Sequence, residues 1–220
     1  MKEPKITFHI LSAFPESFGY LFTSILKRAQ NKNIIKIKIH DLKRFTKDNL
    51  DDRPYGGGYG MVMKPEPFLR ALEKIIKKSK YKKEERIIIF FDLKGKIFNQ
   101  KMIAKLKKFK EIVLICGHYE GVDERVAKVS DLKLSVGNFI LTGGEIPAMI
   151  VIDSLTRTLE GVINENSLEE KRGYFSFPVY TRPQKVKFFD KILKVPKVLL
   201  KGDHKKIEEF RKKTGKKLNL

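Results

Sequence analysis

The sequence predicts an α/β protein whose parallel sheet is covered by helices on both faces. Apolar segments with the length of strands alternate along the chain with segments whose apolar residues recur at helical spacing. Two of the strand segments, 87–91 and 112–116, are apolar at every position. Such runs are typical of strands that are buried on both faces, so we expect these two at the centre of the sheet.

The N-terminal part contains two expected strands and one expected helix. Residues 5–14 begin as an alternating strand, and Pro15 then opens a helix that runs to about residue 30, because proline suits the first turn of a helix. Residues 34–39 combine isoleucine with lysine, which predicts a half-exposed strand. From 41 to 63 the sequence shows no periodic pattern.

The middle of the chain continues the alternation. A helix starts at Pro65, and a short basic helix at 102–109 separates the two apolar strands. Residues 132–136 predict a weaker strand. The segment 144–159 is apolar almost all round, so we expect a buried helix there.

The C-terminal part has a different composition. Residues 161–183 are polar and contain several glycines, asparagines and prolines, and this segment is longer than an ordinary loop. This segment is therefore either a loop with a function of its own or a linker. A small helical tail follows from Val195.

Charge is the most unusual feature of the composition. The chain has 47 basic and 26 acidic residues, which gives a net charge of +21, while 41% of its residues are hydrophobic. This hydrophobic fraction is sufficient for a folded core, so the chain is not a disordered polycation. A polyanion such as nucleic acid is the natural partner of such a surface. The alternative is a general lysine bias without functional meaning.

Several classes of protein are excluded. A single cysteine rules out a disulfide scaffold and a cysteine-based zinc site, and no other metal site is expected. The first ten residues show no signal-peptide pattern, and no apolar run approaches the roughly 18 residues that a membrane span needs. We therefore expect a soluble, cytoplasmic protein.

The first glycine cluster covers residues 54–61. Gly56, Gly58 and Gly60 formally match the GxGxG loop of ordinary Rossmann methyltransferases, but that loop must follow a strand directly, and residues 51–54 are not strand-like. No Lys-Ser/Thr pair follows, which excludes a P-loop. The cluster is either a backbone that a ligand approaches closely or a plain flexible turn.

Two further clusters follow the ends of strands, where ligands bind in open parallel sheets. Residues 116–125 gather one histidine and several acidic, basic and aromatic side chains, although His118 alone is a weak signal and Cys116 is better read as a buried small residue than as a nucleophile. Residues 135–147 place apolar side chains between glycines. This pattern suits the adenine face of a cofactor, with backbone groups supplying polar contacts.

The three clusters, in their order along the chain, make the sequence resemble the bacterial tRNA (guanine-N1)-methyltransferase family (TrmD-like, SPOUT knotted methyltransferases). The resemblance extends from the first strand to about Arg211, and its stretches are highly specific only in combination. The matching stretches are Ala13-Phe14-Pro15-Glu16, Asp51-Asp52-Arg53-Pro54-Tyr55-Gly56-Gly57-Gly58, Gly60-Met61-Val62-Met63-Lys64-Pro65-Glu66-Pro67, Cys116-Gly117-His118-Tyr119-Glu120-Gly121-Val122-Asp123-Glu124-Arg125, Leu141-Thr142-Gly143-Gly144-Glu145-Ile146-Pro147-Ala148-Met149 and Tyr180-Thr181-Arg182-Pro183.

The resemblance implies a fold and a function. It implies a deep trefoil knot in the sheet, S-adenosylmethionine bound in that knot, and a homodimer that shares a tRNA site. The expected reaction is methyl transfer to N1 of the guanosine 3′-adjacent to the anticodon. The implied parts are a knotted cofactor-binding catalytic domain at 1–160, a long flexible interdomain loop at 161–183, and a small, truncated C-terminal helical tRNA-binding subdomain at 184–220.

The resemblance also assigns residues to the site. Guanine N1 must lose a proton before it can attack, and negative charge then spreads onto O6, which requires a cation. The family pattern places that cation at Arg157, and Glu120 and Asp123 would orient the base and the loops. The residues assigned to S-adenosylmethionine are Phe90, Phe91, Gly117, Val136, Gly137, Asn138, Phe139, Ile140, Leu141, Gly143 and Gly144.

The sequence departs from the family pattern in its loops. His118 stands where the family has arginine, Asn138-Phe139 replace Asp-Tyr, and Asp92-Leu93-Lys94 replace Ser-Pro-Gln. The stretch between Phe45 and Asp51 is shortened, and the C-terminal tail stops early.

The general base is the largest departure. The family carries an aspartate in the long loop, but this chain is about two residues short there and has Lys171-Arg172 in the corresponding place. Glu169 and Glu170 stand immediately before it, and Glu170 is the preferred candidate for the base.

Three alternatives stay open at this level. The chain could be a knotted RNA-binding protein with impaired catalysis, or a knotted methyltransferase that acts on another RNA base. A basic RNA-binding protein without a cofactor is the third, and the two glycine-containing loops at strand ends argue against it.

Overall fold

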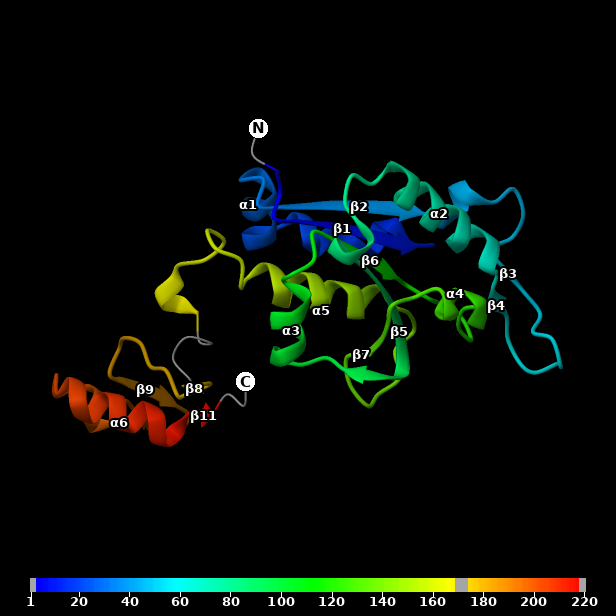
Figure 1. The fold of residues 1–220 in the computed structure, drawn as a ribbon. Coiled ribbons are helices and arrows are strands. Elements are labelled where there is room, and N and C mark those ends of the chain that lie inside the picture. Colours follow the sequence, from blue (N-terminus) through cyan, green and yellow to red (C-terminus); the bar gives the residue numbers. More distant parts are fainter. Residues whose placement is uncertain (1–2, 169–173, 218–220) are drawn as a thin grey trace. The chain divides into compact units, whose positions relative to one another are not determined.

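A computed structural model describes residues 3–168 and 174–217 of the chain (Figure 1). The chain divides into two compact units, Met1–Ile163 and Asn164–Leu220, which we describe separately. Their functional roles stay predictions. No helix in the described ranges is long and apolar enough to cross a membrane.

Unit 1 is built on a parallel five-stranded sheet with the order β2-β1-β6-β5-β7. The strands are β1 (Ile6–Ser12), β2 (Ile35–Asp41), β5 (Arg86–Ile97), β6 (Glu111–Ile115) and β7 (Leu132–Ser135). The two fully apolar runs lie in β5 and β6, which occupy interior positions as predicted. The α/β class with a parallel sheet is thus confirmed, while the knot stays a prediction.

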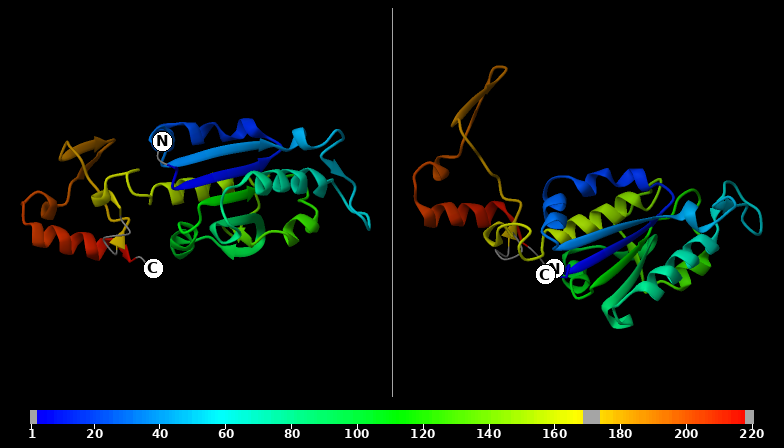
Figure 2. Two further views of the ribbon diagram at one scale, coloured as in Figure 1. Left: turned by 45° about the horizontal axis from the view of Figure 1, so that its top comes forward. Right: turned by 90° about the horizontal axis from the view of Figure 1, so that it is seen from above.

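Helices cover both faces of this sheet, which explains why the inner strands are apolar throughout (Figure 2). In β6, Ile112 and Leu114 point to one hydrophobic core, whereas Val113 and Ile115 point to the other. The first core is covered by η1 (Pro15–Phe22), α1 (Ser24–Asn31), α3 (Gln100–Leu106) and α5 (Glu145–Thr156); the second is covered by α2 (Pro65–Lys78) and α4 (Glu124–Lys128).

The helix expected from Pro15 to about residue 30 is in fact two helices. The break lies at Thr23, whose backbone is extended (φ −120°, ψ 166°), and Ser24 follows with a φ of +44°. Thr23 ends the first helix and precedes the second, and its backbone N–H and its hydroxyl both donate to the carbonyl of Tyr20. The spacing of the apolar residues gave no sign of this break, because it continues across Thr23.

Strand β5 is longer than its apolar run and contains an excursion. Its register with β7 jumps from Phe91↔Leu134 to Lys96↔Leu134. Gly95 closes the excursion because a Cβ there would lie 2.5 Å from the backbone nitrogen of Leu134. The residues between the two registers are thereby pushed out of the sheet.

The segment without periodicity forms small elements around the first glycine cluster. These are η2 (Leu42–Phe45) and the two-residue strands β3 (Asp51–Asp52) and β4 (Val62–Met63), which pair antiparallel. Gly56, Gly57, Gly58 and Gly60 all have positive φ, which only glycine adopts readily. The cluster is thus the tip of a hairpin and not a Rossmann loop.

Unit 2 contains the predicted helix α6 (His204–Thr214) and further elements that the sequence did not predict. These are η4 (Glu165–Ser167), β8 (Tyr174–Phe175), β9 (Lys185–Phe188), β10 (Lys191–Lys194), η6 (Lys197–Leu199) and β11 (Lys216–Lys217). The antiparallel pairs are β9 with β10 and β8 with β11. The hairpin lies within 184–220, where only helical structure was expected, because its lysines do not alternate regularly with apolar residues.

A polar network is buried where β1, β2, β5 and β6 lie side by side. His9 Nδ1 lies 2.8 Å from His40 Nε2, and its Nε2 lies 3.2 Å from Glu111 Oε1. Glu111 also accepts hydrogen bonds from Ser79 and Arg86. Burial raises the pKa of Glu111, but the hydrogen bonds from His9, Arg86 and Ser79 outweigh it and bring the pKa to about 2.

This network makes stability depend on pH. The pKa of His40 falls from 6.5 to about 4 because burial disfavours its charged form, with the charges of His9, Lys38 and Lys74 adding to the effect. Between pH 6.5 and about pH 4, His40 is more often protonated in the unfolded chain than in the folded one. Acidification through this range therefore destabilises the fold. From pH 7 to pH 5 we expect a loss of about 1 kcal/mol, discounted for partial exposure.

Urea unfolding at several pH values tests this expectation. The loss between pH 7 and pH 5 is expected to shrink in His40→Gln, which retains hydrogen-bonding capacity towards His9 but does not titrate. An unchanged pH profile in the variant would show that another group is responsible.

Candidate cofactor site

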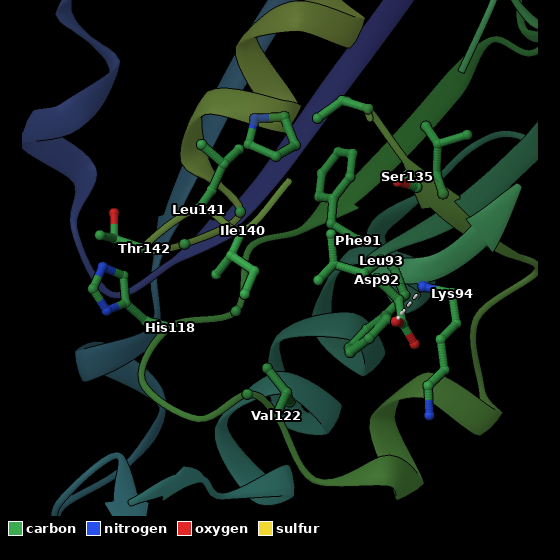
Figure 3. A pocket seen from close by; sticks show the side chains of 18 of the residues that line it. Phe91, Asp92, Leu93, Lys94, His118, Val122, Ser135, Ile140, Leu141 and Thr142 are labelled. Carbon is green, nitrogen blue, oxygen red and sulfur yellow. Dashed lines mark hydrogen bonds between the residues drawn. The ribbon is translucent and has the colours of Figure 1, made fainter. Parts of the chain in front are cut away.

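A cavity of about 430 Å³ opens where β5, β6 and β7 end (Figure 3). Its size lies within the range of small-molecule sites. Its walls come from the excursion of β5, from the loop after β6 and from the loop after β7. The lining residues are Phe90, Phe91, Asp92, Leu93, Lys94, Gly117, His118, Tyr119, Glu120, Gly121, Val122, Glu124, Leu134, Ser135, Val136, Gly137, Phe139, Ile140, Leu141, Thr142, Gly143, Gly144 and Pro147.

The loops after β6 and β7 are held together through their backbones. Gly144 N–H donates to Gly117 O at 2.8 Å, and His118 lies opposite Gly143 in an antiparallel backbone pairing. The contact is so close that a Cβ on Gly144 would lie 2.6 Å from the Cα of Cys116. Glycine is thus required here by close packing of two loops.

The loop after β6 is also held from its other side, by the β3–β4 hairpin. Glu120 N–H donates to Met61 O (3.1 Å), and Met63 N–H donates to Gly121 O (2.9 Å). Gly60 (φ +77°) packs directly on Glu120, since a Cβ there would lie 2.4 Å from its Cγ. The first glycine cluster therefore supports the wall that carries Glu120.

Buried contacts orient the start of α5. Glu145 is 8% exposed and accepts a hydrogen bond from Ser12 Oγ at 2.7 Å, which joins the end of β1 to the first turn of the helix. Burial raises the pKa of the Cys116 thiol well above its usual range, and the nearby Glu145 adds to the effect. A thiol in this state is protonated at neutral pH, so Cys116 is no nucleophile.

The charged groups near the cavity are mostly paired with each other. Lys133 lies 2.7 Å from Glu124 Oε1 and 4.0 Å from Asp92 Oδ2. Two side-chain hydrogen bonds from Arg125, both 2.8 Å, lower the pKa of Asp123, and its side chain also caps α4. Asp123 is therefore a structural acid, poorly suited to accept a proton from a substrate.

The structure brings most of the predicted cofactor residues together. All of them line the cavity except Asn138, which is exposed and lies outside the lining. Glu120 lines it as well. Their role in binding S-adenosylmethionine stays a prediction.

Several lining residues were not assigned from the sequence. Leu134, Ser135 and Pro147 belong to regular elements that border the cavity, and Asp92, Leu93 and Lys94 lie on the excursion of β5. Lys94 N–H donates to Asp92 Oδ1, which closes a local turn (Figure 3). The sequence signal for this segment was that Asp92-Leu93-Lys94 stand where the family has Ser-Pro-Gln.

Of the predicted catalytic residues that the structure describes, Glu120 lines the cavity and Arg157 does not. Arg157 is the C-cap of α5, whereas the cavity lies at the other end of this 12-residue helix, about 18 Å away. Arg157 is not among the lining residues. Glu169 and Glu170 lie outside the described residues.

The cavity suits a nucleoside-containing cofactor. Phe90, Leu134, Ile140, Leu141 and Pro147 supply apolar area for a flat base, and the two glycine-containing loops expose backbone groups beside it. Glu120 supplies negative charge for a cationic ligand, whereas Asp92 and Glu124 lie beside Lys133. These residues fit S-adenosylmethionine, which combines an adenine ring with a positive sulfonium group.

The fold and the cavity define an α/β protein with a small-molecule-sized cavity at the carboxyl edge of a parallel sheet. A family model described as "tRNA (Guanine-1)-methyltransferase TrmD" matches residues 6–219, and the chain therefore belongs to this family.

Individual relatives agree with this assignment. The chain is 43% identical to a tRNA (guanine-N(1)-)-methyltransferase of Dictyoglomus turgidum, over 94% of this chain and 84% of the relative. A protein of the same name from Clostridioides difficile is 43% identical over 93% of this chain and 90% of its own. The crystal structure of tRNA (m1G37) methyltransferase from Aquifex aeolicus superimposes with a TM-score of 0.78 and 38% identity, covering 94% of this chain and 88% of the other.

Proposed function

We propose that the protein transfers a methyl group from S-adenosylmethionine to N1 of the guanosine 3′-adjacent to the anticodon in tRNA. One observation carries the proposal: two stretches that match the family, 116–125 and 141–149, meet at one cavity, and the hairpin that carries two further matching stretches, 51–58 and 60–67, supports its wall. The net charge of +21 suits a polyanionic substrate. Because tRNA is the proposed substrate, we also propose that the protein acts in the cytoplasm.

The reaction assigns distinct tasks to the residues. When bound, S-adenosylmethionine supplies an electrophilic methyl group. A carboxylate of the chain must accept the N1 proton of guanine, and a cation must face O6 as negative charge develops there. We assign the proton to Glu170, with Glu169 next to it, and the cation to Arg157.

We further propose a homodimer, because Arg157 cannot serve the cavity of its own chain. It lies at the far end of α5, so the cavity would be completed by the partner subunit's Arg157. The helix was expected to be buried, but Ile146 and Ile150 are 50% and 36% exposed. Together with Tyr20 and Phe22 of η1, which packs on α5, they form an apolar face that a second copy would cover.

A charge introduced on this face tests the dimer. Ile150→Asp is expected to convert the dimer into monomers and to abolish methyl transfer, because a carboxylate would be buried without a partner. Ile76→Asp is the matched control, since Ile76 is 44% exposed on α2, on the opposite face of the sheet. Light scattering after size exclusion gives the mass. A monomeric wild type, or a dimeric Ile150→Asp, would contradict the proposed interface.

A methyl-transfer assay tests the activity itself. Labelled S-adenosylmethionine is incubated with a tRNA that carries guanosine beside the anticodon and with the same tRNA carrying adenosine there. Label is expected only in the first tRNA. Binding of both RNAs and of the cofactor without transfer would leave a knotted RNA-binding protein instead of an enzyme.

The base assignment makes a separate prediction. Glu170→Gln retains the shape of the side chain and removes its basicity, so turnover at saturating cofactor and tRNA should fall about 100-fold or more. A single-turnover assay at several pH values measures this. If Glu170→Gln and Glu169→Gln both react at the wild-type rate, the base lies elsewhere, and Glu120 becomes the next candidate.

A further inference from the structure

The β9–β10 hairpin of unit 2 exposes apolar side chains that its own unit does not cover. Every residue of both strands is exposed. Phe188 and Phe189 are 60% and 80% exposed, whereas Phe175, Phe177 and Phe210 of the same unit are half-buried. Figure 2 (right) shows the hairpin projecting from the rest of unit 2. A two-stranded hairpin is marginal by itself, so an apolar surface of this kind indicates a binding partner.

The register of the hairpin sorts its side chains into two faces. Residues directly opposite each other share a face, and Phe188 pairs with Lys191 while Val186 pairs with Leu193. The other face carries Lys185 opposite Lys194 and Lys187 opposite Ile192. The hairpin therefore has an apolar face that ends in an aromatic ring, and a basic face behind it.

The turn adds a second ring at an unusual position. Phe189 and Asp190 connect the strands, and Phe189 has a φ of +49°, a conformation that asparagine and glycine adopt more easily than phenylalanine. Its ring lies 4.8 Å from that of Phe188, edge to face. An exposed phenylalanine contributes little to the fold here, and its backbone is strained.

The charge of the hairpin selects the kind of partner. Between Gln184 and Val195 it carries four lysines and only one acid, Asp190. A basic strand pair with exposed aromatic rings is the combination by which proteins hold unpaired nucleotides, because the rings stack on bases while the lysines neutralise phosphates.

We propose that Phe188 and Phe189 stack on unpaired nucleobases of the RNA substrate, with Lys185, Lys187, Lys191 and Lys194 contacting its phosphates. This inference rests on the proposed function for the identity of the RNA. The hairpin would then distinguish a folded RNA with an open loop from a plain duplex, whose bases are not accessible for stacking.

The test uses the full-length protein and two labelled probes: an anticodon stem-loop RNA and a blunt RNA duplex of the same length. Phe188→Ala and Phe189→Asn are each expected to weaken stem-loop binding about 10-fold and to leave duplex binding unchanged. Leu193→Ala is the matched control, because Leu193 lies on the same face with 56% exposure but has no ring. It should retain wild-type affinity within about 2-fold.

Two further measurements separate stacking from other roles. Phe189→Asn relieves the turn, so its melting temperature should equal or exceed that of the wild type while its RNA affinity falls. Lys187→Ala should weaken binding of both probes and lower the slope of log K against log salt by about one, because one counterion fewer is released. The Phe variants should keep the wild-type slope.

Other results would overturn the proposal. Wild-type stem-loop affinity in both Phe variants would exclude stacking. A change in the mass of the particle or a lowered melting temperature in Phe189→Asn would mean that the rings pack against protein. Binding is measured without cofactor, so a ring-dependent stem-loop affinity supports the inference even if methyl transfer fails.

Discussion

Replacing Gly143 with valine is expected to abolish binding of S-adenosylmethionine. A Cβ at this position would lie 2.3 Å from Glu145 Oε2, 2.6 Å from His118 Cδ2 and 3.1 Å from Gly117 O. A β-branched side chain therefore separates the two loops that form the cavity wall. We expect the dissociation constant to rise at least about 100-fold, equivalent to about 3 kcal/mol.

Isothermal titration calorimetry measures the affinity, and circular dichroism shows whether the fold is retained. Thr214→Val is the control because it introduces the same side chain at an exposed position of α6 that does not line the cavity. Its affinity should change only a few-fold. A folded Gly143→Val with wild-type affinity would mean that the cofactor binds elsewhere.

Replacing Arg157 with alanine is expected to lower kcat by roughly 100- to 1,000-fold while the affinities for cofactor and tRNA change little. The charge on guanine O6 develops in the transition state, so its partner contributes mainly to the rate. Arg44→Ala removes the same charge from a side chain that is 84% exposed and serves as the control. Equal losses in binding and rate would assign Arg157 to RNA binding instead.

A mixed dimer tests whether Arg157 acts across the interface. Co-expression of Gly143→Val and Arg157→Ala subunits with different tags gives a heterodimer in which one subunit retains the cavity and the other retains the arginine. If the site is shared, this heterodimer regains about half of the wild-type rate, because one of its two sites is complete. If Arg157 acts within its own chain, neither site is complete and no activity returns.

The apolar runs alone were sufficient to predict the core of the fold. Ile87–Phe91 and Ile112–Cys116 could only be interior strands, because alternate side chains of a strand face opposite sides and all of them needed burial. The pattern could not locate the break at Thr23 or the excursion before Gly95. Both depend on local backbone hydrogen bonds and close approaches, which leave apolar periodicity unchanged.

The C-terminal unit was predicted less well for a related reason. Four lysines are spread among the apolar residues of 185–194, and this mixture resembles a solvated surface when the partner strand is unknown. Pairing of β9 with β10 gives each side chain a neighbour and separates an apolar from a basic face. The sequence contains these residues, but only the pairing of the two strands sorts them into two faces.

For the site, the sequence by itself identified two glycine-containing segments at strand ends, 116–125 and 135–147, and both contribute to the cavity wall. Only the tertiary structure decided which of them meet. Backbone contact between Gly117 and Gly144 joins two loops into one cavity wall, and the first glycine cluster turns out to support the wall beside Glu120. The length of α5 separates Arg157 from that cavity by about 18 Å. Spacing along a chain cannot reveal such distances, because the path of the backbone through the sheet sets them.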